Sequence, residues 1–208
     1  NMLRVVKLKS PMSMGTWGLT LFAMFASLSA LLELLPFRTL RKLVALAGAP
    51  LGLFLGGYTG VLISATAIPL WFKNRLLWGP TFLASALSTG VAAVQAALSL
   101  RGPSSDKLHQ ADTLAVVAEG ALLIASLVNL GDTAQPLTRG KWSTLFVPGV
   151  FGLGVMLPLL LGRRAPLLRS ACVLLGGLIL RACVVYAGKD SADDPQAYFA
   201  LTNRNRSR

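Results

Sequence analysis

The chain has 208 residues, of which 54% are hydrophobic and only 13% are charged, and its mean hydropathy is +0.63. These values lie outside the range of ordinary soluble domains, so they exclude a soluble enzyme or binding domain and indicate a membrane protein. The net charge of +12 does not indicate a nucleic-acid-binding protein, because the basic residues gather between the apolar segments and in the tail. Membrane proteins ordinarily keep their basic residues there.

Six long apolar segments follow one another along the chain, and each is long enough to cross about 30 Å of hydrocarbon as a helix. They cover roughly residues 15–32, 43–70, 76–100, 112–130, 142–161 and 167–186. The connections between them are short, so no separate soluble domain is expected. The sequence therefore predicts an all-α membrane protein, a polytopic bundle of six transmembrane helices over residues 1–189, with a polar C-terminal tail over residues 190–208.

Large aromatic residues lie at corresponding ends of the predicted helices, all on one side of the membrane: Trp17, Trp71, Trp78, Trp142 and Tyr186. Trp and Tyr prefer the headgroup level, so an interfacial belt is the expected interpretation, and a docking surface on this side is the alternative. The basic residues of the loops are spread over both sides, so the positive-inside rule does not decide the orientation.

The second apolar segment carries a small residue at every fourth position: Gly48, Gly52, Gly56, Gly60 and Ser64. Such a stripe lets a neighbouring helix approach closely, so it predicts tight helix packing. Tyr58 lies near the middle of this predicted helix, where its hydroxyl needs a hydrogen-bond partner. The adjacent Gly57 leaves space for a ligand, which makes Tyr58 a candidate binding residue.

The fourth apolar segment contains two acids, Asp112 and Glu119, which are seven residues apart. This spacing is close to two helical turns, so both carboxylates are predicted on one stripe of the helix. A charged acid deep in a membrane costs on the order of 3 kcal/mol, so Glu119 is expected to be protonated, paired with a cation or facing water. The alternatives are a packing hydrogen bond for Glu119 and a helix N-cap for Asp112.

The last apolar segment holds Arg181, which we predict to be the one basic residue inside a span. Arg169, near the start of this segment, is predicted to be one of the basic residues of the preceding loop. Arg181 can extend to the headgroups, or it can pair with an acid or an anionic intermediate inside the bundle.

Several cofactor sites are not expected in this chain. The one histidine, His109, excludes bis-histidine haem ligation, and Cys172 and Cys183 do not form an iron–sulfur ligand set. Three turns separate these cysteines on one helix, which is too far for a disulfide. We expect neither haem, nor an iron–sulfur cluster, nor another metal or nucleotide site here.

Five sequence motifs follow one another along the chain: "LRVVKLKSPMSMGTWGLTLF", "LGGYTGVLISATAIPLW", "LLWGPTFLASALSTGVAA", "HQADTLAVVAEGALL" and "LILRACVVYAGK". In this order they resemble the NrfD/PsrC-type membrane subunit of polysulfide reductases and related respiratory complexes. The resemblance spans residues 1 to about 189. It implies a haem-free, multi-pass subunit in a bacterial inner (plasma) membrane that binds a quinone, either menaquinone or ubiquinone.

The resemblance also implies partners and residue roles. An iron–sulfur, ferredoxin-like subunit would exchange electrons with the bound quinone, and a separate catalytic redox subunit would act on the terminal substrate, so this chain alone is not expected to be catalytic. Tyr58, in the "YTG" motif, would donate a hydrogen bond to a quinone carbonyl. Glu119 and Asp112 would carry protons toward the quinone, and Arg181 would stabilise the quinol anion or pair with Glu119.

One feature differs from the family pattern. Its members usually have two spans before the segment "SPMSMG", whereas this chain begins "NMLRVVKLKSPMS". We interpret the chain as the C-terminal portion of a longer protein, or as one whose first helices come from elsewhere. Two other classes are alternatives: an ion-coupled secondary transporter fragment, in which intramembrane acids also occur, and a membrane anchor without a quinone site.

Overall fold

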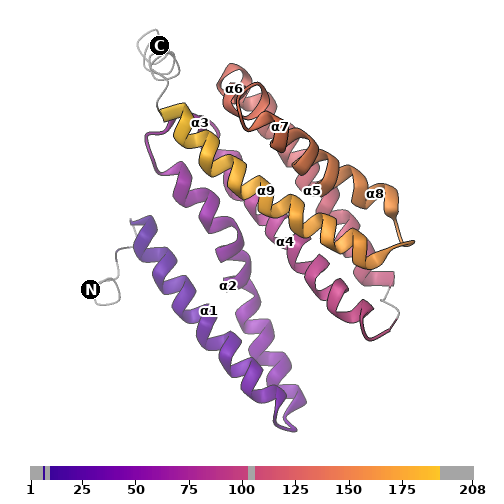
Figure 1. The fold of residues 1–208 in the computed structure, drawn as a ribbon. Coiled ribbons are helices and arrows are strands. Elements are labelled where there is room, and N and C mark those ends of the chain that lie inside the picture. Colours follow the sequence, from indigo (N-terminus) through magenta and orange to yellow (C-terminus); the bar gives the residue numbers. More distant parts are fainter. Residues whose placement is uncertain (1–6, 8–9, 103–105, 193–208) are drawn as a thin grey trace.

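The computed structural model describes residue 7 and residues 10–102 and 106–192. These residues form six helical segments that are long and apolar enough to cross a membrane (Figure 1). Four of them are the single helices α1(Pro11–Glu33), α2(Arg38–Ser64), α4(Arg75–Ser99) and α9(Pro166–Ala192). The other two are compound: α5(Asp106–Leu130) continues through η2(Gly131–Ala134) and α6(Gln135–Thr138), and α7(Ser143–Phe146) continues through η3(Val147–Met156) and α8(Leu157–Leu161). The predicted all-α polytopic membrane fold is confirmed.

The ends of the helices differ from the predicted ones. Helix α2 begins at Arg38, five residues before its predicted start, because Arg and Lys are good helix formers and extend it into the polar region. It ends at Ser64 instead of residue 70, because the chain turns there and Pro69 starts the short helix α3(Pro69–Lys73). Tyr58 therefore lies near the end of α2 and not at its middle. Of the predicted tail, only residues 190–192 lie within the described residues, and they belong to α9.

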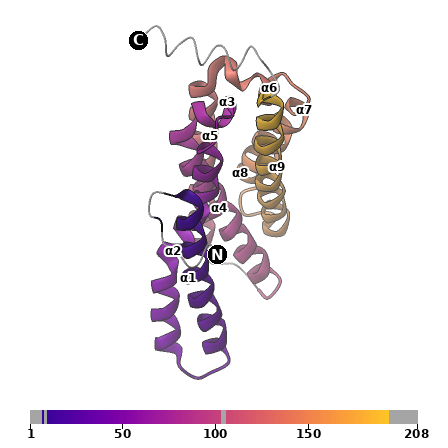
Figure 2. The ribbon, with the colours of Figure 1, turned by 90° about the vertical axis from the view of Figure 1, so that its left-hand side faces the viewer.

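Four of the six spans form a bundle, and the other two form a hairpin beside it. Helix α4 packs against both α5 and α9. The span containing η3 also packs against these two helices, α5 and α9. Helices α1 and α2 pack against each other, and α2 joins them to α4. The turn between α1 and α2 projects beyond the rest of the structure (Figure 2). Only 17% and 11% of the apolar stretches of α1 and α2 are buried, against 50% for α9.

The bundle is built from regularly spaced buried residues. On α5, the buried side chains recur at alternating intervals of four and three residues: Asp112, Val116, Glu119, Leu123, Ser126 and Leu130. Knobs-into-holes packing produces this interval when helices lie nearly parallel or antiparallel. The buried face includes acids and serines, so polar and apolar levels alternate along the bundle. One apolar level consists of Ala92, Val116, Val155 and Val173, which we call the apolar layer.

The span between Ser143 and Leu161 is irregular because it contains two prolines, Pro148 and Pro158, which cannot donate backbone hydrogen bonds. Its central ten residues form a π-helix. Here two helices make a very close contact, since a Cβ atom added to Gly176 of α9 would lie 2.2 Å from the Cα atom of Gly154. Glycine at these two positions allows the backbones to touch.

Two tryptophans expected in an interfacial belt lie in the interior instead. Trp78 is only 1% exposed, and Trp71 donates a hydrogen bond from its indole nitrogen to the carbonyl of Val184, at 2.9 Å. Trp71 lies in α3 and Trp78 in the first turn of α4, and both belong to the main hydrophobic core. The belt prediction is wrong for these two residues. Trp142 stacks on Tyr186, with 4.9 Å between ring centroids.

The glycine stripe of α2 packs against two different helices. A Cβ atom at Gly48 or Gly52 would meet Phe25 or Phe22 of α1, whereas one at Gly56 would meet side chains of α4. At Gly60 it would lie 2.3 Å from the backbone carbonyl oxygen of Trp78. The stripe thus holds α2 between α1 and α4, as close small-residue packing predicts.

Replacing Gly60 by alanine is expected to lower the free energy of unfolding by about 1–3 kcal/mol, because the obstructing atom belongs to the backbone of α4 and cannot rotate away. Gly90→Ala on α4 is the matched control. A Cβ atom there meets nothing within 4 Å, and alanine is the better helix former, so stability should rise slightly. Titration with sodium dodecyl sulfate in mixed micelles measures both. Equal losses for the two variants would contradict the close contact between α2 and α4.

Candidate functional site

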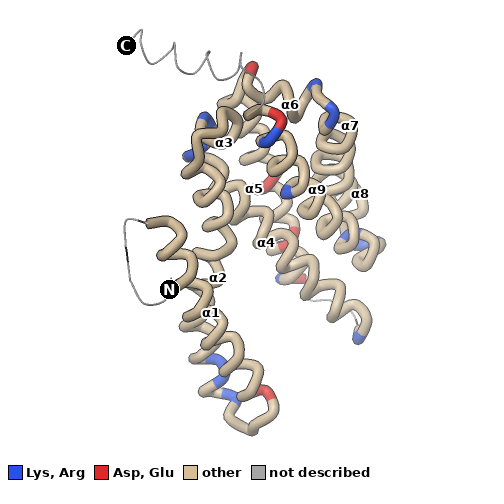
Figure 3. The backbone as a smooth tube through the Cα atoms, turned by 60° about the vertical axis from the view of Figure 1, so that its left-hand side comes forward, with Lys and Arg blue, Asp and Glu red and all other residues tan. Residues whose placement is uncertain are grey.

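Charged residues gather mainly at the ends of the helices, but a few lie inside the bundle where α4, α5 and α9 meet (Figure 3). Two of the interior ones are the acids Asp112 and Glu119 of α5, which are 0% and 4% exposed. The other two are the arginines Arg169 and Arg181 of α9. A buried charge in a membrane bundle is costly, so each of these groups requires a compensating partner.

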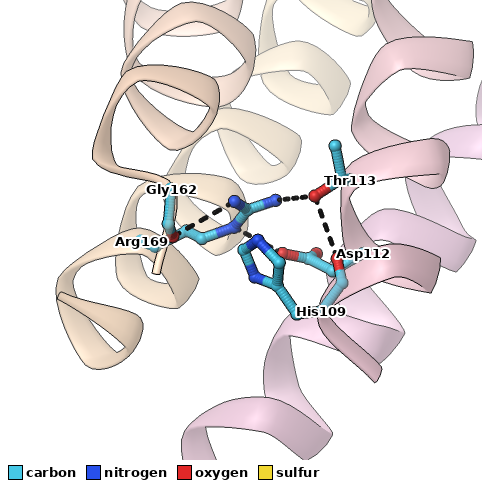
Figure 4. Close-up of polar contacts among 5 residues, drawn as sticks. All are labelled: His109, Asp112, Thr113, Gly162 and Arg169. Carbon is cyan, nitrogen blue, oxygen red and sulfur yellow. Dashed lines mark hydrogen bonds and ion pairs between the residues drawn. The ribbon is translucent and has the colours of Figure 1, made fainter. Parts of the chain in front are cut away.

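Asp112 forms a buried ion pair with Arg169. The guanidinium Nε donates to the carboxylate Oδ2 at 2.6 Å, and both side chains are at most 1% exposed. The remaining guanidinium nitrogens donate to the hydroxyl of Thr113 at 3.0 Å and to the carbonyl of Gly162 at 3.3 Å (Figure 4). The Thr113 hydroxyl in turn donates to the carbonyl of His109, at 2.9 Å. Arg169 therefore joins its own helix α9 to two other elements, α5 and the turn after α8.

Two sequence predictions are corrected here. Asp112 is not a helix cap, because α5 begins at Asp106 and Asp112 lies nearly two turns inside it. Arg169 does not belong to a flanking loop, because α9 begins at Pro166 and turns the arginine into the bundle. Proline is favoured at the first position of a helix, so Pro166 was the signal that could have placed Arg169 inside α9.

Glu119 lies further along the same face of α5 and makes hydrogen bonds to α4. The hydroxyl of Ser88 donates to its carboxylate, and Ser85 provides a second side-chain hydrogen bond. Among the described residues no cation lies within ion-pair distance of this carboxylate, but Arg181 is close enough to interact with it electrostatically. Glu119 therefore makes hydrogen bonds between helices, which was the alternative prediction for this residue. Arg181 lies near its carboxylate.

Arg181 turns back toward the middle of the bundle and does not extend to the headgroups. Its guanidinium donates to the carbonyl of Gly177 at 3.0 Å and to the hydroxyl of Ser85 at 3.2 Å. Its guanidinium carbon lies 5.9 Å from the ring centroid of Phe82, within cation–π range. Because Gly177 has no side chain, the space beside α9 is open to the guanidinium. Ser85 thus connects Arg181 with Glu119.

The two buried clusters are separated by the apolar layer. Val116 lies between Asp112 and Glu119 on α5, and it packs with Ala92, Val155 and Val173, all at most 8% exposed. The acids are therefore on one face of the helix, about 10 Å apart along its axis, without a continuous polar path between them among the described residues. A proton passing from one acid to the other would require water to enter the apolar layer.

Tyr58 lies apart from these clusters, at the interface of α1 and α2. Its hydroxyl donates to the carbonyl of Pro11 at 2.7 Å, and its ring covers Gly15. The space predicted beside Gly57 is filled, because a Cβ atom there would lie 3.2 Å from the backbone oxygen of Gly79. Tyr58 thus has a partner at the start of α1, and the prediction of open space at Gly57 is wrong.

A cavity of about 630 Å³ opens between α1 and α2. Aromatic and small residues line it, with polar groups at one end: Phe22, Phe25, Ala26, Gly48, Ser29 and Glu33. Its α2 residues precede Tyr58 by about ten positions, or about 15 Å of helix, so Tyr58 does not line it. Glu33 forms an ion pair with Arg41 at this end of the hairpin.

Comparison with known proteins gives two similar relatives and a family match. A sequence profile of the family described as polysulfide reductase, of the NrfD type, matches residues 2–193. Protein NrfD of Escherichia coli K12 is 34% identical over 161 residues, and the C subunit of polysulfide reductase from Wolinella succinogenes is 31% identical over 164 residues. Each alignment covers 67% of this protein, which spans about half the length of both relatives, 50% and 51%. No solved structure matches the protein significantly.

Proposed function

Because this protein belongs to the NrfD-type polysulfide reductase family of membrane proteins, we propose that it is a quinone- or quinol-binding subunit of a respiratory oxidoreductase complex. In this function it passes electrons between the quinone pool and a partner iron–sulfur subunit, with associated proton transfer. The observation that carries the proposal, beside the family, is the buried network of Glu119, Ser85, Ser88 and Arg181. A merely hydrophobic anchor has no need of an acid and an arginine in its interior.

Proton transfer is the chemistry that these residues can support. A bound quinone, menaquinone or ubiquinone, supplies two-electron redox chemistry that takes up or releases two protons. Glu119 can hold and pass a proton, Asp112 can receive one nearer the end of the bundle, and Arg181 can stabilise negative charge beside Glu119. The serines Ser85 and Ser88 orient the Glu119 carboxylate toward α4.

Tyr58 is the proposed contact to the quinone. Its half-buried aromatic ring and phenolic hydroxyl lie between α1 and α2. They are near the end of α2 from which the chain continues into α3. Its hydroxyl would have to leave the carbonyl of Pro11 to donate to a quinone carbonyl. The partner iron–sulfur subunit would dock at this same end, so that electrons travel a short distance. This protein itself would lie in a bacterial inner membrane.

Binding of a quinone analogue to the protein in nanodiscs tests this function. We expect saturable binding that weakens about tenfold in Tyr58→Phe, the loss of one hydrogen bond of about 1.4 kcal/mol. Tyr186→Phe is the matched control, because Tyr186 is 47% exposed and stacks on Trp142 away from α1 and α2. Fluorescence titration with the analogue measures both affinities.

A membrane anchor without a quinone site is the second candidate. It is favoured by two observations on Tyr58, namely the bond to Pro11 and the closed space beside Gly57. An anchor would show no saturable binding of the analogue. Equal affinity for Tyr58→Phe and wild type, with binding retained, would instead place the quinone elsewhere, for example in the cavity between α1 and α2.

A further inference from the structure

Three buried oxygen atoms, one each on α4, α5 and α9, have no hydrogen-bond partner among the described residues. They are the second carboxylate oxygen of Asp112, Oδ1, the amide oxygen of Gln95 and the hydroxyl of Ser170. All three residues are at most 1% exposed. Buried polar atoms in folded proteins are nearly always bonded to protein or to ordered water, since an unpaired one costs free energy.

The helix packing places these three residues on one level of the bundle. Helices α4 and α5 are antiparallel, and their contacts Thr81–Ser126 and Ser88–Glu119 lie seven residues apart on each helix. The next position in this register sets Gln95 opposite Asp112. Ser170 follows Arg169, which bonds Asp112 directly. We call Gln95, Asp112 and Ser170 the outer polar layer, because it lies one turn beyond the apolar layer.

We propose that the outer polar layer is a water-binding site. The carboxylate and amide oxygens only accept hydrogen bonds, so they cannot satisfy each other, whereas one water molecule donates to both and accepts from the Ser170 hydroxyl. A metal cation fits the same oxygens poorly. The carboxylate charge is already balanced by Arg169 at 2.6 Å, and a second positive charge beside the guanidinium would be costly in a low-dielectric interior.

The two sides of this site differ in polarity. Toward the middle of the bundle, the apolar layer separates it from Glu119. In the other direction, His109 lies beside Asp112 and Arg169, and its buried Nδ1 is also without a partner among the described residues (Figure 4). Beyond His109, Asp106 forms an exposed ion pair with Arg163, at 3.0 Å. Under the proposed function, protons would reach Asp112 from this side. This use rests on the proposed function, whereas the water site itself does not.

Replacing Gln95 by leucine tests the site, because leucine has a similar volume and lacks the amide. If water bridges Gln95 and Asp112, the thermal midpoint of the full chain in nanodiscs should fall by about 2–8 °C. Gln110→Leu is the control, since Gln110 is exposed on the same helix as Asp112, and its midpoint should change little. An unchanged or raised midpoint for Gln95→Leu overturns the proposal, because removing an unpaired amide from a dry layer stabilises the fold.

Two further measurements keep the test decisive. A midpoint that rises with sodium concentration in wild type, but not in Gln95→Leu, would show a cation site and overturn the water site. A high-resolution structure of the protein in nanodiscs should show density within hydrogen-bond distance of Gln95, Asp112 and Ser170; direct bonds among these side chains would overturn it. None of these measurements involves a quinone. The water site can therefore be disproved while the proposed function stands, and the proposed function can be disproved while the water site stands.

Discussion

Replacing Arg169 by methionine is expected to lower the free energy of unfolding by about 3–5 kcal/mol, because Asp112 is then left in the bundle without its cation. Both side chains are at most 1% exposed, so solvent cannot compensate the loss. The remaining carboxylate must stay charged in the interior or take up a proton, and both cost free energy. Methionine keeps most of the apolar stem of arginine, so the loss reports mainly on the charge. Titration with sodium dodecyl sulfate in mixed micelles measures it.

The protein offers a matched control for this loss. Arg163 also forms an ion pair, with Asp106, but these side chains are 58% and 78% exposed, so Arg163→Met should cost only about 0–1 kcal/mol. The double variant Arg169→Met with Asp112→Leu removes both buried charges and should recover to within about 1 kcal/mol of wild type. Losses of equal size for the two single arginine variants would contradict the buried pair.

The fold class could be predicted from the sequence because a bilayer leaves few choices. Backbone groups in hydrocarbon must all be hydrogen-bonded inside the protein, and a helix does this within its own segment, so six long apolar runs predict six helices. The helix ends were less predictable. Arg38 and the bases after it prolong α2 into the polar region, where hydropathy falls but helix propensity does not. The end of α2 at Ser64 depends on the turn before Pro69, and this shift moved Tyr58 away from the predicted middle of the helix.

The candidate site was predictable only in part. The seven-residue spacing placed Asp112 and Glu119 on one face of α5, since this depends on the helical period alone. Their partners depend on which helices face one another. Arg169 is 57 positions from Asp112, and Ser88 is 31 positions from Glu119, so neither pair leaves a local pattern. Trp71 and Trp78 were misplaced for the same reason, because hydropathy does not show that α3 and the start of α4 pack into the core.

Replacing Glu119 by glutamine is expected to slow quinol-linked turnover of the assembled complex by about 100-fold or more, the usual contribution of a proton-transferring side chain. Glutamine has the same shape and can still hydrogen-bond to Ser88 and Ser85, so the α4–α5 contact should persist. It cannot carry a proton. Rates of quinol oxidation or quinone reduction in proteoliposomes, followed by absorbance, measure the effect. A rate within about twofold of wild type would contradict a proton-transfer role for Glu119.

Glu33→Gln is the matched control, because Glu33 lies at the exposed turn between α1 and α2, paired with Arg41. Its turnover should stay close to that of wild type. Affinity for the quinone analogue separates the two ways in which Glu119→Gln could act. A slow variant with normal affinity has lost proton transfer, whereas one with weakened affinity has lost a group that shapes the binding site. The first result is expected, since Glu119 bonds to α4 in the bundle, while Tyr58, the proposed quinone contact, lies between α1 and α2.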